Sequence, residues 1–324
     1  KPDIVFFNFE IKIFGSLKAA IRFPLLLLLL RSKTKTVVTI HQILINKNKK
    51  EGWDLLEEKS LVNIPSFLLK IIIKLFIKVN CNLASKVIVL SPSAKQGLVE
   101  FFHIQEEKII VSNLAMDYKI IPENKEEEND VLQEFQGKKI ILCFGLVASR
   151  KGLEYAILAF NQIKDKLPDH VLVIAGINGG INQDYKNKLM EIINEHNLKN
   201  RVIFTGKISH DKVNTLFRIS DMVIYPYLPY SGASYALFHA IHHKKPIIVT
   251  EIDVFTDILT KEMALFVNVK NSHEISNAIL KLYENPNIKN ELSHNISKIS
   301  NKYSWYDVAQ QHMKIFQSVN DEKK

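Results

Sequence analysis

The sequence predicts an α/β protein of two Rossmann-like halves, each built on a parallel sheet. Three observations support this fold class. Short apolar runs alternate with helical patterns along the chain, which is typical of parallel sheets covered by helices on both faces. A length of 324 residues suits two domains better than one. A polar, acidic stretch over Ile121–Gln136 separates the two alternations and indicates a linker or an exposed connecting element.

The first half is expected to contain four strands and three helices, assigned from apolar runs and from apolar residues at helical spacing. The expected strands are Asp3–Phe7, Thr36–Ile40, Lys86–Leu90 and Lys108–Val111. The expected helices lie near Leu17–Leu30, Ile64–Val79 and Ser93–Phe102. Because Lys1–Phe7 has the character of an interior strand, we expect this half to lack its first strands.

The second half is expected to contain six strands with helices between them. The strands are Lys139–Phe144, His170–Ala175, Arg201–Thr205, Asp221–Tyr225, Pro246–Val249 and Leu265–Val267. The helices lie near Leu153–Lys166, Asp184–His196, Asp211–Ile219, Tyr235–His242 and Ser272–Tyr283. In such sheets, ligands bind beyond the carboxyl ends of the strands.

Composition excludes several classes of protein. Apolar residues make up 47% of the chain and charged residues 24%, which is typical of globular proteins. The formal net charge of +9 suits nucleic acid, an anionic membrane or phosphorylated substrates, but the chain has no motif that reads nucleic acid. Cys81 and Cys143 lie far apart in apolar surroundings, which argues against a disulfide framework and fits a reducing compartment. No apolar run is long enough for a membrane-spanning helix.

The most informative stretch is Ile140–Phe160. An apolar strand ends at Gly145, a loop follows with Arg150 and Lys151 near its end, and a helical pattern begins at Leu153. A helix start offers free N–H groups and a partial positive charge, so the two cations there suit an anionic phosphate. An ordinary turn with solvated cations is the alternative.

Three further loops with glycines follow strands of the second half. They are Ala175–Gly180, Phe204–Ser209 and Tyr225–Tyr235. Any one of them alone fits an ordinary turn between a strand and a helix. Four such loops on one sheet edge favour a pocket of nucleotide size.

The number and order of these motifs resemble the donor-binding domain of family-4 retaining glycosyltransferases (glycosyl transferases group 1). The matching motifs are F-G-x4-R-K-G-L-E-Y-A-I-x-A-F, V-I-A-G, V-x-F-T-G-x-I, D-x-V-I-Y-P-Y and S-G-A-S followed by K-P-I-I-V-T. The first half is similar as well, in K-P-D-I-V-F-F, T-V-V-T-I-H and S-K-V-I-V-L-S-P-S. Ser304–Ala309 resembles the start of the last helix of these proteins.

The resemblance implies a GT-B fold, with two Rossmann-like domains whose parallel sheets face across a cleft. Residues 1–120 would form an acceptor-side domain, 121–137 a linker, 138–302 a nucleotide-sugar donor domain, and 303–324 a helix crossing back to the first domain. The implied activity moves a hexose from a UDP- or GDP-sugar to an acceptor hydroxyl with retention of configuration. Glycolipid, polysaccharide or glycoprotein glycan assembly is the implied setting, and no metal or other cofactor is expected.

The resemblance also implies roles for single residues, wherever a position of this sequence matches a functional position of the family. Lys151 matches the lysine that contacts the donor diphosphate, and Arg150 could replace the arginine that is missing at Leu146. His41 matches the histidine near the donor sugar and acceptor, with a plain polar strand end as the alternative. The expected donor-binding residues are Gly145, Gly176, Thr205, Gly206, Ser231, Gly232, Ala233, Ser234 and His239.

One departure from the family concerns its paired glutamates. They should fall at Ser231 and His239, and no carboxylate occurs between Asp221 and Glu251. A neutral His239 ring can accept a hydrogen bond from a ribose hydroxyl, as the second glutamate does in the family. An active variant and a catalytically degenerate nucleotide-sugar-binding subunit both remain open.

Lys70, Lys74 and Lys78 form a basic stripe on an otherwise apolar helix. Such a helix can lie at an anionic membrane surface, or it can be a core helix with one solvated face. The first interpretation predicts a cytoplasmic protein at the inner face of a membrane, with a lipid-linked sugar as a natural acceptor.

Overall fold

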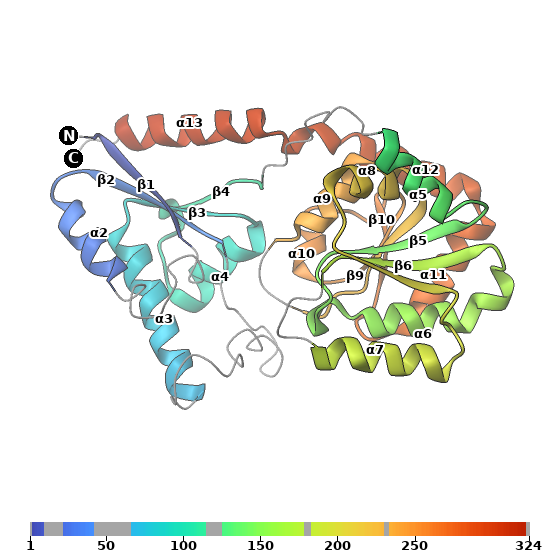
Figure 1. Ribbon diagram of the computed structural model, residues 1–324. Helices are drawn as coiled ribbons and strands as arrows, with labels where there is room; N and C mark the ends of the chain where they lie inside the picture. Colours follow the sequence, from blue (N-terminus) through green and yellow to red (C-terminus); the bar gives the residue numbers. More distant parts are fainter. Residues whose placement is uncertain are drawn as a thin grey trace. The chain divides into compact units, whose positions relative to one another are not determined.

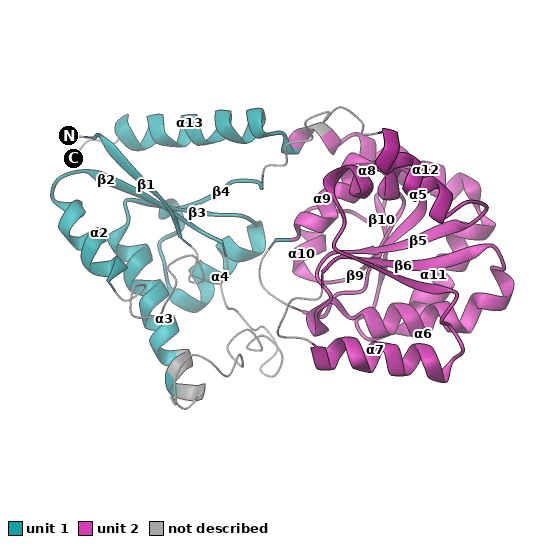
Figure 2. Ribbon diagram, in the orientation of Figure 1, with its two compact units in different colours: residues 1–115, 230–233, 303–324 teal, residues 116–229, 234–302 magenta. Residues whose placement is uncertain are grey.

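The computed structural model describes residues 2–9, 22–41, 66–114, 125–177, 183–229 and 233–321, without the side chains of residues 66, 67, 69, 70 and 301. The chain forms two compact units (Figure 1 and Figure 2). Unit 1 consists mainly of residues 1–115 and 303–324, and unit 2 of residues 116–229 and 234–302. The sequence-predicted helix over 303–324 therefore belongs to the same unit as the first strands.

Unit 1 is a parallel sheet with helices on both faces. Its strands are β1 (Ile4–Phe9), β2 (Lys35–Ile40), β3 (Lys86–Val89) and β4 (Ile109–Val111), in the order β1-β2-β3-β4. Its helices are α2 (Phe23–Arg31), α3 (Ser66–Leu83), α4 (Pro92–Phe102) and α13 (Trp305–Asp321). The four predicted strands lie within two residues of these bounds. The predicted helix near Leu17–Leu30 is described only from Phe23 onward.

Alternating strand residues divide unit 1 into two layers of core. Val38 and Val87 point into a cluster with residues of α2, α3 and α4. Val37 and Ile88 point to the opposite face, where α13 covers them with Ile315 and Val319. Among the described helices of unit 1, Figure 1 shows only α13 on this side of the sheet.

Unit 2 is a six-stranded parallel sheet in the order β10-β9-β8-β5-β6-β7. Its strands are β5 (Lys139–Phe144), β6 (His170–Ala175), β7 (Val202–Gly206), β8 (Ser220–Tyr225), β9 (Ile247–Thr250) and β10 (Ala264–Val267). Its helices are α5 (Lys125–Glu134), α6 (Leu153–Ile163), α7 (Gln183–Glu195), α8 (His210–Ile219), α9 (Tyr235–His242), α10 (Asp253–Thr256), α11 (Ser272–Glu284) and α12 (Pro286–Ser297). Residues of α6, α7 and α11 form the core on one face of the sheet.

The predicted linker over 121–137 differs from the structure, because this stretch contains α5 and belongs to unit 2. Polar contacts hold α5 against α8. Glu128 pairs with Arg218, and the Asp130 carboxylate lies 3.1 Å from Lys212 Nζ. The acidic composition that indicates a linker is therefore one side of a charge-matched helix pair.

Two other differences are smaller. Helices α10 and α12 were not expected, since one is a single turn and the other is mostly polar. The helix expected over Leu153–Lys166 ends at Ile163 and continues as a 3-10 turn. Within the described ranges, no helix has both the length and the apolar character needed to cross a bilayer.

Candidate functional site

In unit 2, the side on which successive strands are added to the parallel sheet changes between β5 and β8. From β5 the chain builds outward through β6 and β7, and then returns to the other side of β5 as β8, β9 and β10. Open parallel sheets bind ligands beyond the carboxyl ends of their strands at such a switch point. The loops after β5 and β8 are therefore the first place to look for a site.

Backbone hydrogen bonds join the loops at this edge. The Gly145 amide donates to the Ala175 carbonyl at 2.9 Å, and the Gly176 amide donates to the Gly206 carbonyl at 3.2 Å. These bonds link the loops after β5, β6 and β7 side by side. For the loops after β5, β6 and β7, the sequence expectation that the glycine loops gather on one edge is therefore confirmed.

A pocket of about 310 Å³ opens at these loops. It is lined by Phe144, Gly145, Leu146, Gly176, Ile177, Lys207, Ile208, His210, Val213 and His239. None of these residues is acidic, and one is a lysine. The pocket thus combines apolar walls with positive charge, a combination that suits an aromatic ring joined to an anion.

Gly176 and Gly152 are required by close backbone approaches. Gly176 has a φ of +149°, and a Cβ there would lie 1.8 Å from the Gly145 carbonyl oxygen. Gly152 has a φ of +59°, and its Cβ would lie 2.1 Å from the Pro226 carbonyl oxygen. Both values are far inside van der Waals contact, so any side chain would push the loops apart.

Lys151 lies at the switch point with only 7% of its surface exposed. It ends a 3-10 turn that begins at Ser149, and its Nζ atom stands 3.6 Å from the centroid of the Tyr227 ring. The Leu228 amide donates to the Arg150 carbonyl at 2.9 Å, which fixes the loop after β5 against the loop after β8.

Opposing effects act on the protonation state of the Lys151 side chain. Burial, and then the charge of Arg150, lower the pKa of Lys151 to about 6. The face of the Tyr227 ring favours the ammonium form, since the ring carries negative charge above its plane. An anionic group arriving beside Lys151 would add to that preference.

The start of α6 differs from the sequence expectation of a free phosphate-binding helix end. The Leu153 amide donates to the Tyr185 hydroxyl at 2.9 Å, and that hydroxyl donates to the Glu154 carboxylate. The first amide of α6 is therefore satisfied within the protein. This amide is therefore not free to bind a phosphate at the start of α6.

Helix α9 also begins at this edge, after β8. Its N-cap residue Ser234 is buried, and among the described residues its hydroxyl has no hydrogen-bond partner. Ala233 precedes it and is half-buried. Ser231 and Gly232, two of the expected donor-binding residues, lie outside the described residues.

His239 of α9 lines the pocket, as expected for a residue that meets the ligand. Its ring stacks on Phe217 at 5.4 Å between centroids and meets Phe144 edge-on. Burial, and then the charges of His210 and His242, lower the pKa of His239 to about 4. The ring is therefore neutral at neutral pH and keeps one nitrogen as an acceptor.

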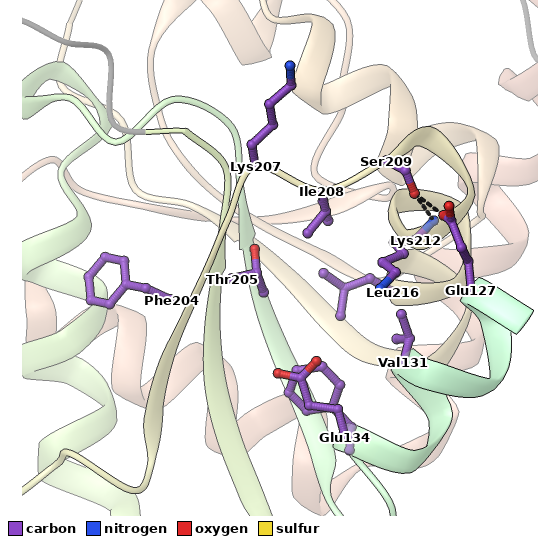
Figure 3. A pocket seen from close by; sticks show the side chains of 11 residues that line it. Glu127, Val131, Glu134, Phe204, Thr205, Lys207, Ile208, Ser209, Lys212 and Leu216 are labelled. Atoms are coloured by element: carbon purple, nitrogen blue, oxygen red, sulfur yellow. Dashed lines mark hydrogen bonds between the residues drawn. The ribbon is translucent and has the colours of Figure 1, made fainter.

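A second hollow of about 380 Å³ lies between α5 and the loop after β7. Figure 3 shows Ser209 turned toward Glu127, to which it donates a hydrogen bond, while Lys207 points away from both. Thr205 lines this hollow and not the first pocket, whereas Lys207 lines both. The structure thus places Thr205, an expected donor-binding residue, at the second hollow and not among the residues that line the pocket with Gly145, Gly176 and His239.

His41 lies in unit 1, at the carboxyl end of β2. Its Nε2 atom shares a hydrogen bond with the Asn8 side chain, and its amide donates to the Phe9 carbonyl at 3.5 Å. The neighbouring strand thus orients the ring. Of the other candidate residues described above, Ala233 groups with unit 1, and the rest belong to unit 2.

Sequence reasoning missed three residues of this edge. Lys207 stood in one of the quoted glycine loops, directly after Gly206, and its charge was the signal available. Tyr227 and Tyr185 gave no signal, because an aromatic residue in a loop or on a helix does not reveal which distant group it touches.

The model of the family glycosyl transferases group 1 matches residues 124–302, more than half of the chain. The chain belongs to this family. The matched region contains the whole pocket edge, from Gly145 to His239. The sequence-based identification of the family is confirmed.

Curated relatives of this glycosyl transferases group 1 protein are distant. The chain is 24% identical to an uncharacterized glycosyltransferase of Methanocaldococcus jannaschii, over 71% of this chain and 59% of that protein. It is 22% identical to the O-antigen chain mannosyltransferase RfbU of Salmonella typhimurium, over 75% of this chain and 61% of that protein. The chain spans about three fifths of the length of the curated relatives it matches.

Solved structures share the fold. Anabaena HepE, crystallised in complex with UDP, superposes with a TM-score of 0.75 at 18% identity, over 98% of this chain and 79% of that one. Sucrose-phosphate synthase from Thermosynechococcus elongatus superposes with a TM-score of 0.75 at 17% identity, over 98% and 73% of the two chains. The α/β class with two parallel sheets, of GT-B type, is confirmed.

Proposed function

We propose that this chain moves a hexose from a nucleotide-diphosphate sugar to an acceptor hydroxyl with retention of anomeric configuration. The observation that carries the proposal is the apolar and positively charged pocket at the carboxyl edge of the unit 2 sheet, in a member of glycosyl transferases group 1. The likeness to HepE in complex with UDP supports a uridine nucleotide over a guanosine nucleotide as donor.

In the proposed reaction, the bond between the anomeric carbon and the diphosphate oxygen breaks. The acceptor oxygen then bonds to the same face of the sugar and passes its proton to the oxygen of the leaving diphosphate. Negative charge grows on the leaving phosphate, so preorganised cations and amides lower the barrier. We assign that role to Lys151, Arg150 and the amides at the start of α9, beside Ser234. No step requires a metal ion, so EDTA should leave transfer unchanged.

We assign recognition of the ribose to His239. Its neutral ring lines the pocket and can accept one hydrogen bond from a ribose hydroxyl. Because the pKa of His239 lies at about 4, the ring keeps this acceptor at neutral and mildly acidic pH. The ordinary histidine pKa would lead one to expect loss of the acceptor below pH 6.5, and the structure moves that limit to lower pH.

The acceptor side of the proposal rests on unit 1. We place His41 near the donor sugar and the acceptor, and take the acceptor to be a glycan or a lipid-linked sugar. A relative at 24% identity, from Streptococcus pneumoniae, is an alpha-galactosylglucosyldiacylglycerol synthase, which supports a lipid acceptor. Lys70, Lys74 and Lys78 would then contact an anionic membrane from the cytoplasmic side. Of these, Lys74 is exposed and Lys78 half-buried, while the Lys70 side chain lies outside the description.

A catalytically degenerate nucleotide-sugar-binding subunit is the second candidate function. It is favoured by one observation: the chain has no carboxylate between Asp221 and Glu251, where the family carries its paired glutamates. Such a subunit would bind the donor through the same pocket without transferring the sugar.

One experiment tests both candidates. Calorimetry with UDP, GDP and their glucose and mannose conjugates measures binding, and anomeric proton NMR follows the fate of the bound sugar. Binding together with release or transfer of an α-configured sugar supports the transferase. Binding with an intact sugar nucleotide supports the subunit, and absence of binding to every nucleotide contradicts both. Lys207→Gln, at an exposed position of the pocket wall, should weaken binding without affecting folding.

A further inference from the structure

Helices α2 and α3 of unit 1 present large aliphatic side chains to solvent. On α2, Leu29 is 68% exposed, and on α3, Leu75 is 61% exposed. Among the side chains that the structure describes, the exposed aliphatic residues on the two helices are Leu25, Leu26, Leu28, Leu29, Leu68, Ile71, Ile72 and Leu75, which we call the α2–α3 face. Isolated exposed leucines are ordinary in proteins, but a contiguous group of this size marks an interaction surface.

The two helices form one surface and not two separate ones. Phe23 and Leu27 of α2, and Ile73 and Ile77 of α3, are buried in the same core cluster beneath the sheet. The helices pack side by side, as Figure 1 shows in blue and cyan. Since both bury their inner sides in one core, their outer sides point the same way.

The charged residues within helices α2 and α3 have a single sign. Neither helix contains an aspartate or a glutamate. Arg22 and Arg31 stand exposed at the two ends of α2, and Lys74 and Lys78 lie beside the apolar stripe of α3. An apolar surface bordered by cations complements an anionic lipid headgroup layer above hydrocarbon.

We propose that the α2–α3 face inserts into the interface of an anionic lipid bilayer, with both helices lying along its plane. The aliphatic side chains enter the boundary between headgroups and acyl chains, and the cations contact lipid phosphates. The inference deepens the proposed function. It rests on that function in one respect only: a lipid-linked acceptor would give the protein a reason to approach a membrane. It goes beyond the lysine stripe, because it assigns the insertion to aliphatic residues of both helices.

The chemistry of the face favours lipid over a protein partner. Protein interfaces are enriched in aromatic residues and carry hydrogen-bonding groups at their rims. Among the described side chains of α2 and α3, every large apolar residue that is exposed is a leucine or an isoleucine, and every charged residue is a cation. Leucine and isoleucine gain from hydrocarbon without needing a shaped pocket.

Vesicle sedimentation of the full chain, without donor or acceptor, tests the proposal. We expect binding to phosphatidylglycerol vesicles, weaker binding to phosphatidylcholine vesicles, and release by salt. Leu28→Gln with Leu29→Gln should lower partitioning at least about tenfold, because two exposed side chains lose their apolar contact. Met313→Gln is the matched control, since Met313 is 54% exposed on α13, on the opposite side of the sheet. Circular dichroism verifies that the variants are folded.

Insertion of the α2–α3 face into the bilayer can be measured separately, by tryptophan fluorescence. Trp emission of a Leu29→Trp variant should shift to the blue on phosphatidylglycerol vesicles and be quenched by brominated lipid. Absence of vesicle binding, or equal binding by the double variant, would overturn the proposal. So would self-association without lipid that the double variant abolishes, because the face would then join two copies of the chain. None of these measurements depends on transfer activity. The membrane proposal can therefore be tested even if the chain proves not to be a glycosyltransferase.

Discussion

Binding of a nucleoside diphosphate is expected to draw a proton onto Lys151. This side chain is 7% exposed, and burial together with the charge of Arg150 lowers its pKa to about 6. A diphosphate placed beside Nζ favours the ammonium form by direct attraction. Ligand binding and protonation should therefore be coupled.

The magnitude follows from the two protonation states. At neutral pH an amine with a pKa of about 6 carries its proton in about one molecule in ten. If the bound phosphate returns the pKa toward the ordinary lysine value of 10.5, protonation becomes complete. The expected uptake is about 0.9 proton per nucleotide bound.

Titration calorimetry of UDP binding in two buffers that differ in ionisation enthalpy measures this uptake directly. Lys151→Met keeps the length of the side chain and removes the titrating group, so its residual uptake is that of the nucleotide itself. Arg150→Gln should reduce the uptake, because the pKa of Lys151 rises when the neighbouring charge is removed. Equal uptake by the original chain and Lys151→Met would refute the reasoning.

Three further predictions concern stability. Gly176→Ala should lower the thermal midpoint and weaken UDP binding, because its Cβ would lie 1.8 Å from the Gly145 carbonyl oxygen. Tyr185→Phe should cost roughly 1–3 kcal/mol in urea unfolding, since it leaves the first amide of α6 and the buried Glu154 without the hydroxyl. The pKa of His239 falls from its ordinary 6.5 to about 4 on folding, so the unfolded chain takes up the proton first. The free energy of unfolding should therefore fall between pH 6.5 and 4, with a smaller slope in His239→Gln.

The strands were predictable because their signal is local. β5 and β6 begin and end at the predicted residues, since each is a continuous apolar run closed by a glycine, Gly145 or Gly176. α5 was not predictable in the same way. Its acidic residues are matched by Arg218 and Lys212 of a helix far along the chain, and a single sequence does not show that pairing.

In the candidate site too, features with a local sequence signal were predictable, and features set by tertiary contacts were not. Its glycines and the position of Lys151 follow from the motif order, and the structure places Gly145, Gly176 and His239 in one pocket. The ring of Tyr227 beneath Lys151 could not be foreseen, because the two residues come from loops on different strands. The low pKa of Lys151 follows from burial by tertiary contacts, which a sequence does not record.

The assignment of α13 to unit 1 has a consequence for biosynthesis. Unit 2 is translated between the two main parts of unit 1, so the apolar patch of Val37 and Ile88 gains the cover of α13 only when Ile315 and Val319 leave the ribosome. Domains fold as units during synthesis, so the early unit must wait, with one sheet face bare, while the later unit is translated. A chain interrupted before Tyr303 would keep this face open and be prone to aggregation, and a chaperone that holds β2 and β3 would protect the nascent protein during that interval.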